Sequence, residues 1–217
     1  MRNGILTFFF IATFFVANGQ DNRFGIGLEY SPNFSNATTP YYLEDNGFRI
    51  AHNAFLLAEY RLVGQLHVTA GFGYLESREF QALNIPDNQF EFFRIESHLF
   101  HHYVVAPVGL EYKFGSFYLR PEIGIGWNVS NTSLNTYYEG TPSSYSVFTQ
   151  KNKDEDNIRG VNSMTYPLFF SFGHEIDLQS CTLIFGAKSY YSLNAIGSTY
   201  GVSGHSYGFG ISLGVRM

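Results

Sequence analysis

The sequence predicts an all-β fold, an eight-stranded antiparallel up-and-down transmembrane β-barrel with a filled polar interior. Three observations support this prediction. Apolar and polar residues alternate with period two through most of the chain, as in strands whose two faces meet different surroundings. The connections between these segments are alternately short and long. Aromatic residues make up 18% of the 217 residues and charged residues only 14%, against roughly 25% charged residues in soluble domains.

The same composition excludes several other classes of protein. Disordered chains are poor in aromatic residues and rich in charge, which is the opposite of this chain. The single cysteine, Cys181, excludes a disulfide scaffold, and 22 glycines without heptads exclude a coiled coil. A formal net charge of −5 without a basic stripe argues against a nucleic-acid-binding protein.

Residues 1–19 have the pattern of a secretory signal peptide. Arg2 precedes an apolar segment from Ile5 to Ala17, and small residues stand before the expected cleavage site after Gly19. The apolar segment is shorter than the ~20 residues that a membrane-spanning helix needs. We therefore expect a signal peptide at 1–19, an outer-membrane β-barrel at 20–217, and no membrane helix in the mature chain.

Eight segments carry the alternation, and each is long enough to cross a bilayer as a tilted strand, which takes about 9–11 residues. In one of them, an apolar face from Phe117 to Val129 opposes a face that holds Arg120 and Glu122. The predicted strands are residues 22–34, 47–61, 65–78, 98–114, 117–130, 161–177, 181–193 and 205–217.

The connections between the strands indicate which end of the barrel faces outward. Short turns are expected at 62–64, 115–116 and 178–180, and long loops at 35–46, 79–97, 131–160 and 194–204. Short turns at one end and long loops at the other are typical of outer-membrane barrels. The alternation continues into the 79–97 region from both sides, which predicts a hairpin above the membrane. The 131–160 region is rich in Asn, Ser, Thr and Tyr and is expected to be a mobile loop.

Alternation alone also fits a secreted soluble β-barrel with its apolar face inward. The polar face here is mostly Gly, Ser, Thr and Asn, whereas a water-facing surface carries about 25–35% charged residues. Aromatic residues also fall near the ends of the strands, where the aromatic girdles of membrane barrels lie. The predicted girdle residues are Tyr30, Tyr60, Tyr74, Tyr112, Phe114 and Phe117.

The inward phase of the predicted strands contains five acidic and five basic residues. An eight-stranded barrel is filled by its own side chains, and buried charges persist when they are paired and hydrogen-bonded. We predict an interior charge network that fixes the register of the strands and leaves no pore; a proton or ion path is the alternative. Its members are Glu29, Glu59, Glu111, Glu122 and Glu175 with Arg61, Lys113, Arg120, Lys188 and Arg216.

One segment resembles a known family. Residues 102–115 read His-Tyr-Val-Val-Ala-Pro-Val-Gly-Leu-Glu-Tyr-Lys-Phe-Gly, and the next strand begins Phe117-Tyr118-Leu119 and becomes Gly-rich by Gly124 and Gly126. This pattern resembles the PorT-type small outer-membrane β-barrel proteins of the Bacteroidetes. The resemblance implies a barrel of loosely defined role, with type IX-like protein secretion as one implied accessory role.

The sequence offers no clear catalytic set, cofactor site or metal site. His98 and His102 share one face of a strand but lie about 13 Å apart, too far to bind one metal ion, and His101 points to the opposite face. The acidic run 154–156 lacks the spacing of a calcium loop. An outer-membrane lipid-modifying hydrolase is the enzymatic alternative, although no serine has a clear partner. Its candidate histidines are His52, His174 and His205.

We therefore predict a non-enzymatic protein of the outer membrane of a Gram-negative bacterium. Its role is structural or interactive, through the loops 79–97 and 131–160. The expected partners are outer-membrane lipid and either envelope proteins or surface glycans, with no nucleic acid, and the protein is expected to be a monomer.

Overall fold

The computed structural model describes residues 23–37, 48–86, 92–141, 144–153, 163–194 and 204–217. The predicted signal peptide and the acidic run 154–156 lie outside these ranges. Ten strands are present in the described residues. They are β1 (Phe24–Ala37), β2 (Arg49–Val63), β3 (Leu66–Pro86), β4 (Phe92–Phe114), β5 (Phe117–Thr141), β6 (Ser144–Lys153), β7 (Met164–Thr165), β8 (Pro167–Asp177), β9 (Thr182–Ser192) and β10 (Ser206–Arg216).

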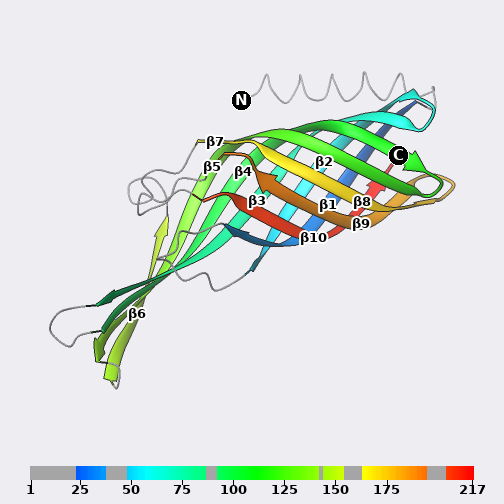
Figure 1. The fold of residues 1–217 in the computed structure, drawn as a ribbon. Helices are drawn as coiled ribbons and strands as arrows, with labels where there is room; N and C mark the ends of the chain where they lie inside the picture. The colour runs from blue at the N-terminus through cyan, green and yellow to red at the C-terminus, as the bar shows by residue number, and fades with distance from the viewer. Residues whose placement is uncertain (1–22, 38–47, 87–91, 142–143, 154–162, 195–203) are drawn as a thin grey trace, which may run out of the picture.

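Eight of these strands form a closed antiparallel barrel (Figure 1). Neighbours in sequence are neighbours in the barrel, with β5 followed by β8, and β1 pairs with β10 to close it. The two-residue strand β7 continues the line of β8 along β5. The predicted eight-stranded up-and-down fold is confirmed.

The strands of the barrel are staggered. Pairing can be followed around the barrel through Gly25, Glu59, Thr69, Gly109, Glu122, Phe169, Tyr190, Gly208 and Ser35. This path leaves β1 at Gly25 and returns to β1 at Ser35, ten residues further along. Such a stagger tilts the strands, and an eight-stranded barrel of this kind is narrow enough for its own side chains to fill.

Two of the predicted short turns are two-residue hairpins. Gly64 and Gly115 each have a positive φ, of 58° and 64°. Glycine adopts this conformation without the steric cost that a side chain would add, and such turns match the twist of the strands that they join. β1 begins and β10 ends at this same end of the barrel, where Ile26 and Met217 exchange backbone hydrogen bonds.

At the other end, β3, β4 and β5 continue past the barrel and form a sheet with β6, here called the protruding sheet (Figure 1). The hairpin predicted for the 79–97 region is confirmed in its described part. The expectation of a mobile loop at 131–160 is wrong for its described part, because β5 runs on to Thr141 and β6 returns beside it. Cross-strand contacts offset the low apolar content, as where Tyr137 and Phe148 stack at 4.7 Å.

A β-bulge lies where β5 leaves the barrel. Tyr103 pairs with Asn128, but the preceding residue His102 pairs with Ser130, so Val129 is the extra residue. A bulge of one residue reverses which side chains of the strand face inward. Below the bulge Asn128 faces inward, and above it Asn131 does.

Candidate functional site

The part of the barrel nearest the short turns is filled by ion pairs centred on Arg120. The Arg120 side chain is fully buried and contacts the carboxylates of Glu29, Glu111 and Glu122, the last two at 3.3 Å. Lys188 also reaches Glu29, with Nζ 2.6 Å from Oε1. Three strands far apart in sequence, β1, β5 and β9, are therefore joined through Glu29.

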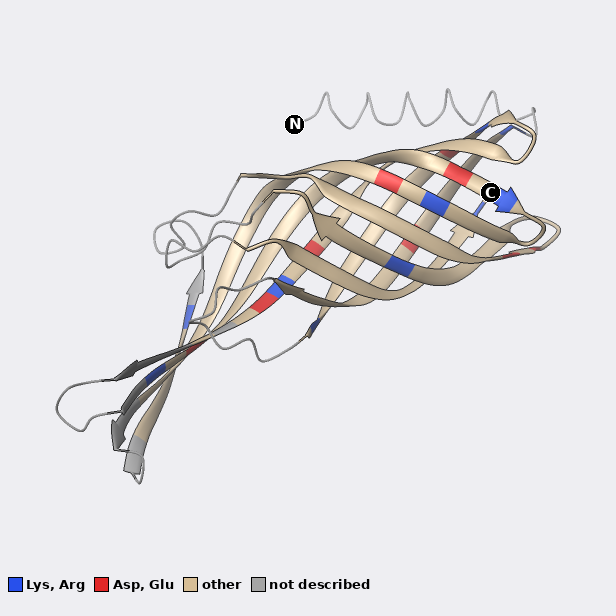
Figure 2. Cartoon of the chain, viewed as in Figure 1, with Lys and Arg blue, Asp and Glu red and all other residues tan. Residues whose placement is uncertain are grey.

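A second group of ion pairs extends from Arg120 to the mouth at the short-turn end. Arg216 lies 2.5 Å from Glu59 and 2.6 Å from Glu175, and it also reaches Glu111 at 3.2 Å. Lys113 bridges Glu59 and Glu175 at 2.9 and 3.2 Å. Residues of this group line a polar cavity of about 580 Å³ that forms the mouth. Charged residues of both signs lie in this half of the barrel, near the C-terminus (Figure 2).

The structure places nine of the ten predicted network residues in these contacts, and Arg61 lies elsewhere. Arg61 is exposed near the β2–β3 turn, where its Nε donates a hydrogen bond to the carbonyl oxygen of Gly64. The register shift between Arg61 and Val63 accounts for this position, because strict alternation ends there. His67 is a contact that the sequence did not reveal, with Nδ1 2.5 Å from Glu59.

An apolar layer fills the barrel beyond the ion pairs. The inward residues of β4 show the order of the layers along the barrel. Glu111 lies among the ion pairs, Val105 and Tyr103 lie in the apolar layer, and His101 lies beyond it. The Lys188 ammonium lies 4.2 Å from the ring centroid of Phe55, at the junction of the two layers. The interior is filled as predicted, with an apolar layer added to the polar one. The layer consists of Phe55, Leu57, Leu75, Tyr103, Val105, Phe169 and Tyr190.

A third layer, the neck cluster, lies where the protruding sheet leaves the barrel, and comprises Glu79, His101, Asn128 and Asn131. His101 Nε2 lies 3.1 Å from Glu79 Oε1, and its Nδ1 lies 2.9 Å from Asn131 Oδ1. The amides of Asn128 and Asn131 hydrogen-bond each other at 2.9 and 2.8 Å. The sequence did not reveal this cluster, because it depends on the bulge that turns Asn131 inward.

The outward face of the barrel is a continuous apolar band. On each of the eight strands, large apolar side chains on this face are 40% or more exposed. The following residues, one from each strand in chain order, are examples: Leu28, Leu56, Phe72, Val108, Ile123, Phe170, Phe185 and Ile211. Water does not stabilise an apolar surface that encircles a protein, whereas the hydrocarbon core of a bilayer does.

The chain is a transmembrane β-barrel. No family model and no curated protein sequence matches it. Solved structures that resemble it include the Neisserial surface protein A, at 14% identity and a TM-score of 0.37 over 89% of this chain and 96% of that one. Ail, the attachment invasion locus protein of Yersinia pestis, has 11% identity and a TM-score of 0.37 over 90% and 98%. The outer-membrane protease OmpT of Escherichia coli has 8% identity and a TM-score of 0.34 over 91% and 97%.

The predicted girdle residues lie on the outward face but not all at its rims. Tyr112, Phe114 and Phe117 stack in series at the short-turn end, and Tyr60 lies close to the same end. At the other end of the band, the Tyr74 hydroxyl lies 2.5 Å from His102 Nδ1. Tyr30 differs, because it lies midway along β1, where its hydroxyl is 2.7 Å from His52 Nδ1. These residues are Tyr30, Tyr60, Tyr74, Tyr112, Phe114 and Phe117.

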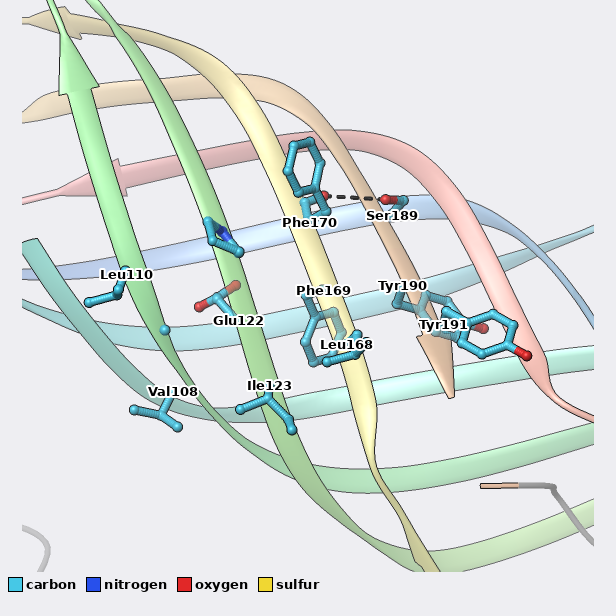
Figure 3. Close-up of a pocket in the computed structure, with 12 residues that line it drawn as sticks. Val108, Leu110, Glu122, Ile123, Leu168, Phe169, Phe170, Ser189, Tyr190 and Tyr191 are labelled. Atoms are coloured by element: carbon cyan, nitrogen blue, oxygen red, sulfur yellow. Dashed lines mark hydrogen bonds between the residues drawn. The ribbon is translucent and has the colours of Figure 1, made fainter. Parts of the chain in front are cut away.

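A shallow apolar crease of about 550 Å³ crosses the outward face over β4, β5, β8 and β9 (Figure 3). It lies at Pro121, which has no backbone N–H to donate. Beside it, the pairing of β4 with β5 passes from Gly109 directly to Tyr112. Ser189 lies in the crease and donates a hydrogen bond to the carbonyl oxygen of Phe170. The twelve residues that line it include no histidine, so the crease does not have the composition of a hydrolase site.

The candidate histidines of the enzymatic alternative pack against aromatic rings. His52 is bonded to Tyr30, and His174 lies between Phe117 and Phe185 at 4.9 and 5.5 Å. His205 stacks on Tyr191 at 5.4 Å, and its Nδ1 donates a hydrogen bond to the carbonyl oxygen of Ser192. The described residues contain no group of three or more potential metal ligands and no helix that could span a membrane.

The single tryptophan provides a direct test of the apolar band. Trp127 is 44% exposed on the outward face of β5. We expect brominated acyl chains to quench its fluorescence strongly when the protein is folded into phospholipid vesicles. Aqueous acrylamide should quench it weakly in this state and strongly in urea. Strong quenching by acrylamide in the folded protein, with none by brominated lipid, would support the soluble-barrel alternative instead.

Proposed function

We propose that this chain is a non-enzymatic protein of the outer membrane of a Gram-negative bacterium, and that it binds an extended polypeptide segment at the edge of β6. One observation carries the proposal. β6 forms the end of the protruding sheet and, among the described residues, pairs only with β5. The long-loop end of the barrel, which carries this sheet, faces outward in proteins of this architecture.

The composition of β6 supports a polypeptide as the partner. A strand at the edge of a sheet presents a row of backbone donors and acceptors that a further strand can pair with. Residues 146–151 are exposed, and Val147 and Phe148, on opposite faces, are 52% and 50% exposed. Natural edge strands usually avoid such apolar side chains, because they invite pairing. An extended chain with apolar residues of its own would pair with the backbone and cover both side chains.

The barrel serves this function as an anchor. Its interior holds a layer of ion pairs, an apolar layer and the neck cluster in succession, which supports a sealed barrel without a pore. Membership of the PorT-type family, and with it an accessory role in secretion, stays a prediction from the residues between His102 and Gly126. A lipid-modifying hydrolase has no support from the histidine contacts described above.

The native partner of β6 supplies a probe. Residues 132–141 of β5 pair with one edge of β6 in antiparallel register, from Thr132 opposite Lys153 to Thr141 opposite Ser144, and a copy of this strand can be offered to the opposite, open edge. A fluorescent peptide with the sequence of residues 132–141 should bind the intact protein in detergent, whereas a scrambled peptide should not. Deletion of residues 135–156 should abolish this binding and leave the barrel folded, as shown by heat-modifiable mobility on gels.

A point variant separates loss of the edge from loss of the whole hairpin. The double substitution Val147→Lys and Phe148→Lys should abolish peptide binding, because lysines on an edge strand oppose pairing. Gln65→Lys, which adds a charge at the short-turn end, should leave the binding unchanged. Equal binding by the intact protein and the deletion variant would contradict the proposal, as would binding of purified surface polysaccharide in place of the peptide.

A further inference from the structure

The neck cluster holds a histidine in an unusual setting. His101 is fully buried, at 0% exposure, at the point where β3, β4 and β5 leave the barrel to form the protruding sheet. β2 and β3 pair no further outward than Asn53 with Leu75, and β5 leaves β7 after Trp127. The contacts of His101 with Glu79 and Asn131 therefore join three strands at the level where the rest of the barrel wall ends, since Ser35 of β1 still bonds the backbone of Arg78 there.

Both ring nitrogens of His101 face oxygen atoms. Nε2 faces a carboxylate oxygen of Glu79, and Nδ1 faces the amide oxygen of Asn131. The Asn131 amide also makes two hydrogen bonds with the Asn128 amide, which ties it into the neck cluster. When Glu79 is ionised, the carboxylate oxygen and the amide oxygen of Asn131 both accept hydrogen bonds, and the ring donates from both nitrogens. His101 is then a buried cation, and Glu79 is its counter-ion.

Among the residues that the structure describes, few other titratable groups surround His101. β3 contributes Glu79, β5 contributes the neutral amides, and β4 itself contributes Tyr103, whose ring belongs to the apolar layer. Burial lowers the pKa of His101, but the hydrogen bond and charge of Glu79 and the hydrogen bond of Asn131 outweigh it and raise the pKa above its ordinary value. Stabilisation by this contact is therefore complete below the ordinary pKa of histidine and is lost as the pH rises through the raised value.

We propose that His101 is a pH-sensitive link that holds β3, β4 and β5 together at the base of the protruding sheet while the imidazole is protonated, and that this part of the sheet loosens when the proton leaves. Deprotonation removes one donor and leaves a ring nitrogen against an oxygen, next to a carboxylate that has lost its counter-ion. The sheet then becomes more mobile in alkaline medium, while the barrel keeps its ion pairs. The importance of this link for binding rests on the proposed function of β6, but the link itself does not.

Hydrogen exchange measured without any peptide tests the link alone. The intact protein in lipid nanodiscs is compared at pH 6 and pH 9, with exchange corrected for its intrinsic pH dependence. We expect the protection of the peptides covering 78–86 and 131–141 to fall about tenfold for each unit by which the pKa of His101 is raised. The peptide covering 24–34 in the barrel should show no such fall.

Two variants assign the change to His101. His101→Gln should abolish the pH dependence of protection in the sheet. His98→Gln, which removes a histidine from the outward face of the same strand, should preserve it. An equal pH dependence in the wild type and His101→Gln would overturn the proposal, and so would a wild-type sheet whose protection does not change with pH.

A titration guards against misfolding of the His101→Gln variant. Histidine ring resonances followed by NMR in the wild type should place the pKa of His101 above its ordinary value, and Glu79→Gln should lower it. A wild-type midpoint at or below the ordinary value would overturn the link even if the peptide binds β6. Conversely, an intact link without peptide binding would overturn the proposed function and not the link.

Discussion

Replacing Arg120 by methionine is expected to lower the free energy of unfolding by about 3–5 kcal/mol. Methionine fills much of the same volume but leaves the carboxylates of Glu29, Glu111 and Glu122 with less counter-charge in a fully buried place. Breaking a buried ion pair from one side is costly because the remaining charge cannot reach water and is left with less compensation. Urea titration of the protein in phospholipid vesicles measures the effect.

Two further variants show whether the loss comes from unpaired charge. Adding Glu29→Gln to Arg120→Met should recover part of the stability, since it removes one of the carboxylates that have lost Arg120. Arg94→Met breaks the partly exposed pair of Arg94 with Glu96 in the protruding sheet, at 2.9 Å, and should cost less than about 1 kcal/mol. Similar losses for Arg120→Met and Arg94→Met would show that the interior charges do not stabilise the barrel.

Replacing Phe55 by alanine is expected to cost about 3–5 kcal/mol, because it leaves a cavity at the centre of the apolar layer. The Phe55 ring packs edge-on against Phe169 at 5.4 Å and lies under the Lys188 ammonium. The same urea titration measures the loss. Phe148→Ala, at the half-exposed edge of the protruding sheet, removes only the stack with Tyr137 and should cost less than about 1 kcal/mol. Equal losses of stability for Phe55→Ala and Phe148→Ala would mean that the apolar layer inside the barrel is loosely packed.

The alternation of side chains was sufficient to predict the barrel. Each transmembrane strand has one face in lipid and one face inside, so the period of two is strong, as from Phe117 to Val129. The same alternation placed Arg120 and Glu122 inside, because every second side chain of a strand in a narrow barrel points into its filled interior. Arg61 was misplaced because it lies next to a turn, where the alternation ends and its long side chain reaches the Gly64 carbonyl.

The features outside the membrane were harder to predict. β6 has few apolar residues, and polar residues such as Thr149 and Gln150 occupy both of its faces. Because this strand lies in water, neither face has to be apolar, and the alternation that marks a strand in the sequence is weak. The neck cluster depends on the register of three strands and on the bulge at Val129, and neither follows from residue types alone. In an uninterrupted strand, the side chains of Asn128 and Asn131 would point to opposite faces. The bulge brings both of them inward.

The ladder between β4 and β5 has a mechanical consequence. It runs from Phe92 paired with Gly140 in the protruding sheet to Phe114 paired with Phe117 at the turn, and so passes through the whole thickness of the membrane without a connecting loop. A partner that pulls on the sheet loads these strands along their length, and the hydrogen bonds of the ladder then resist the force together instead of opening one after another. Tension applied to the protruding sheet would therefore pass directly into the barrel wall.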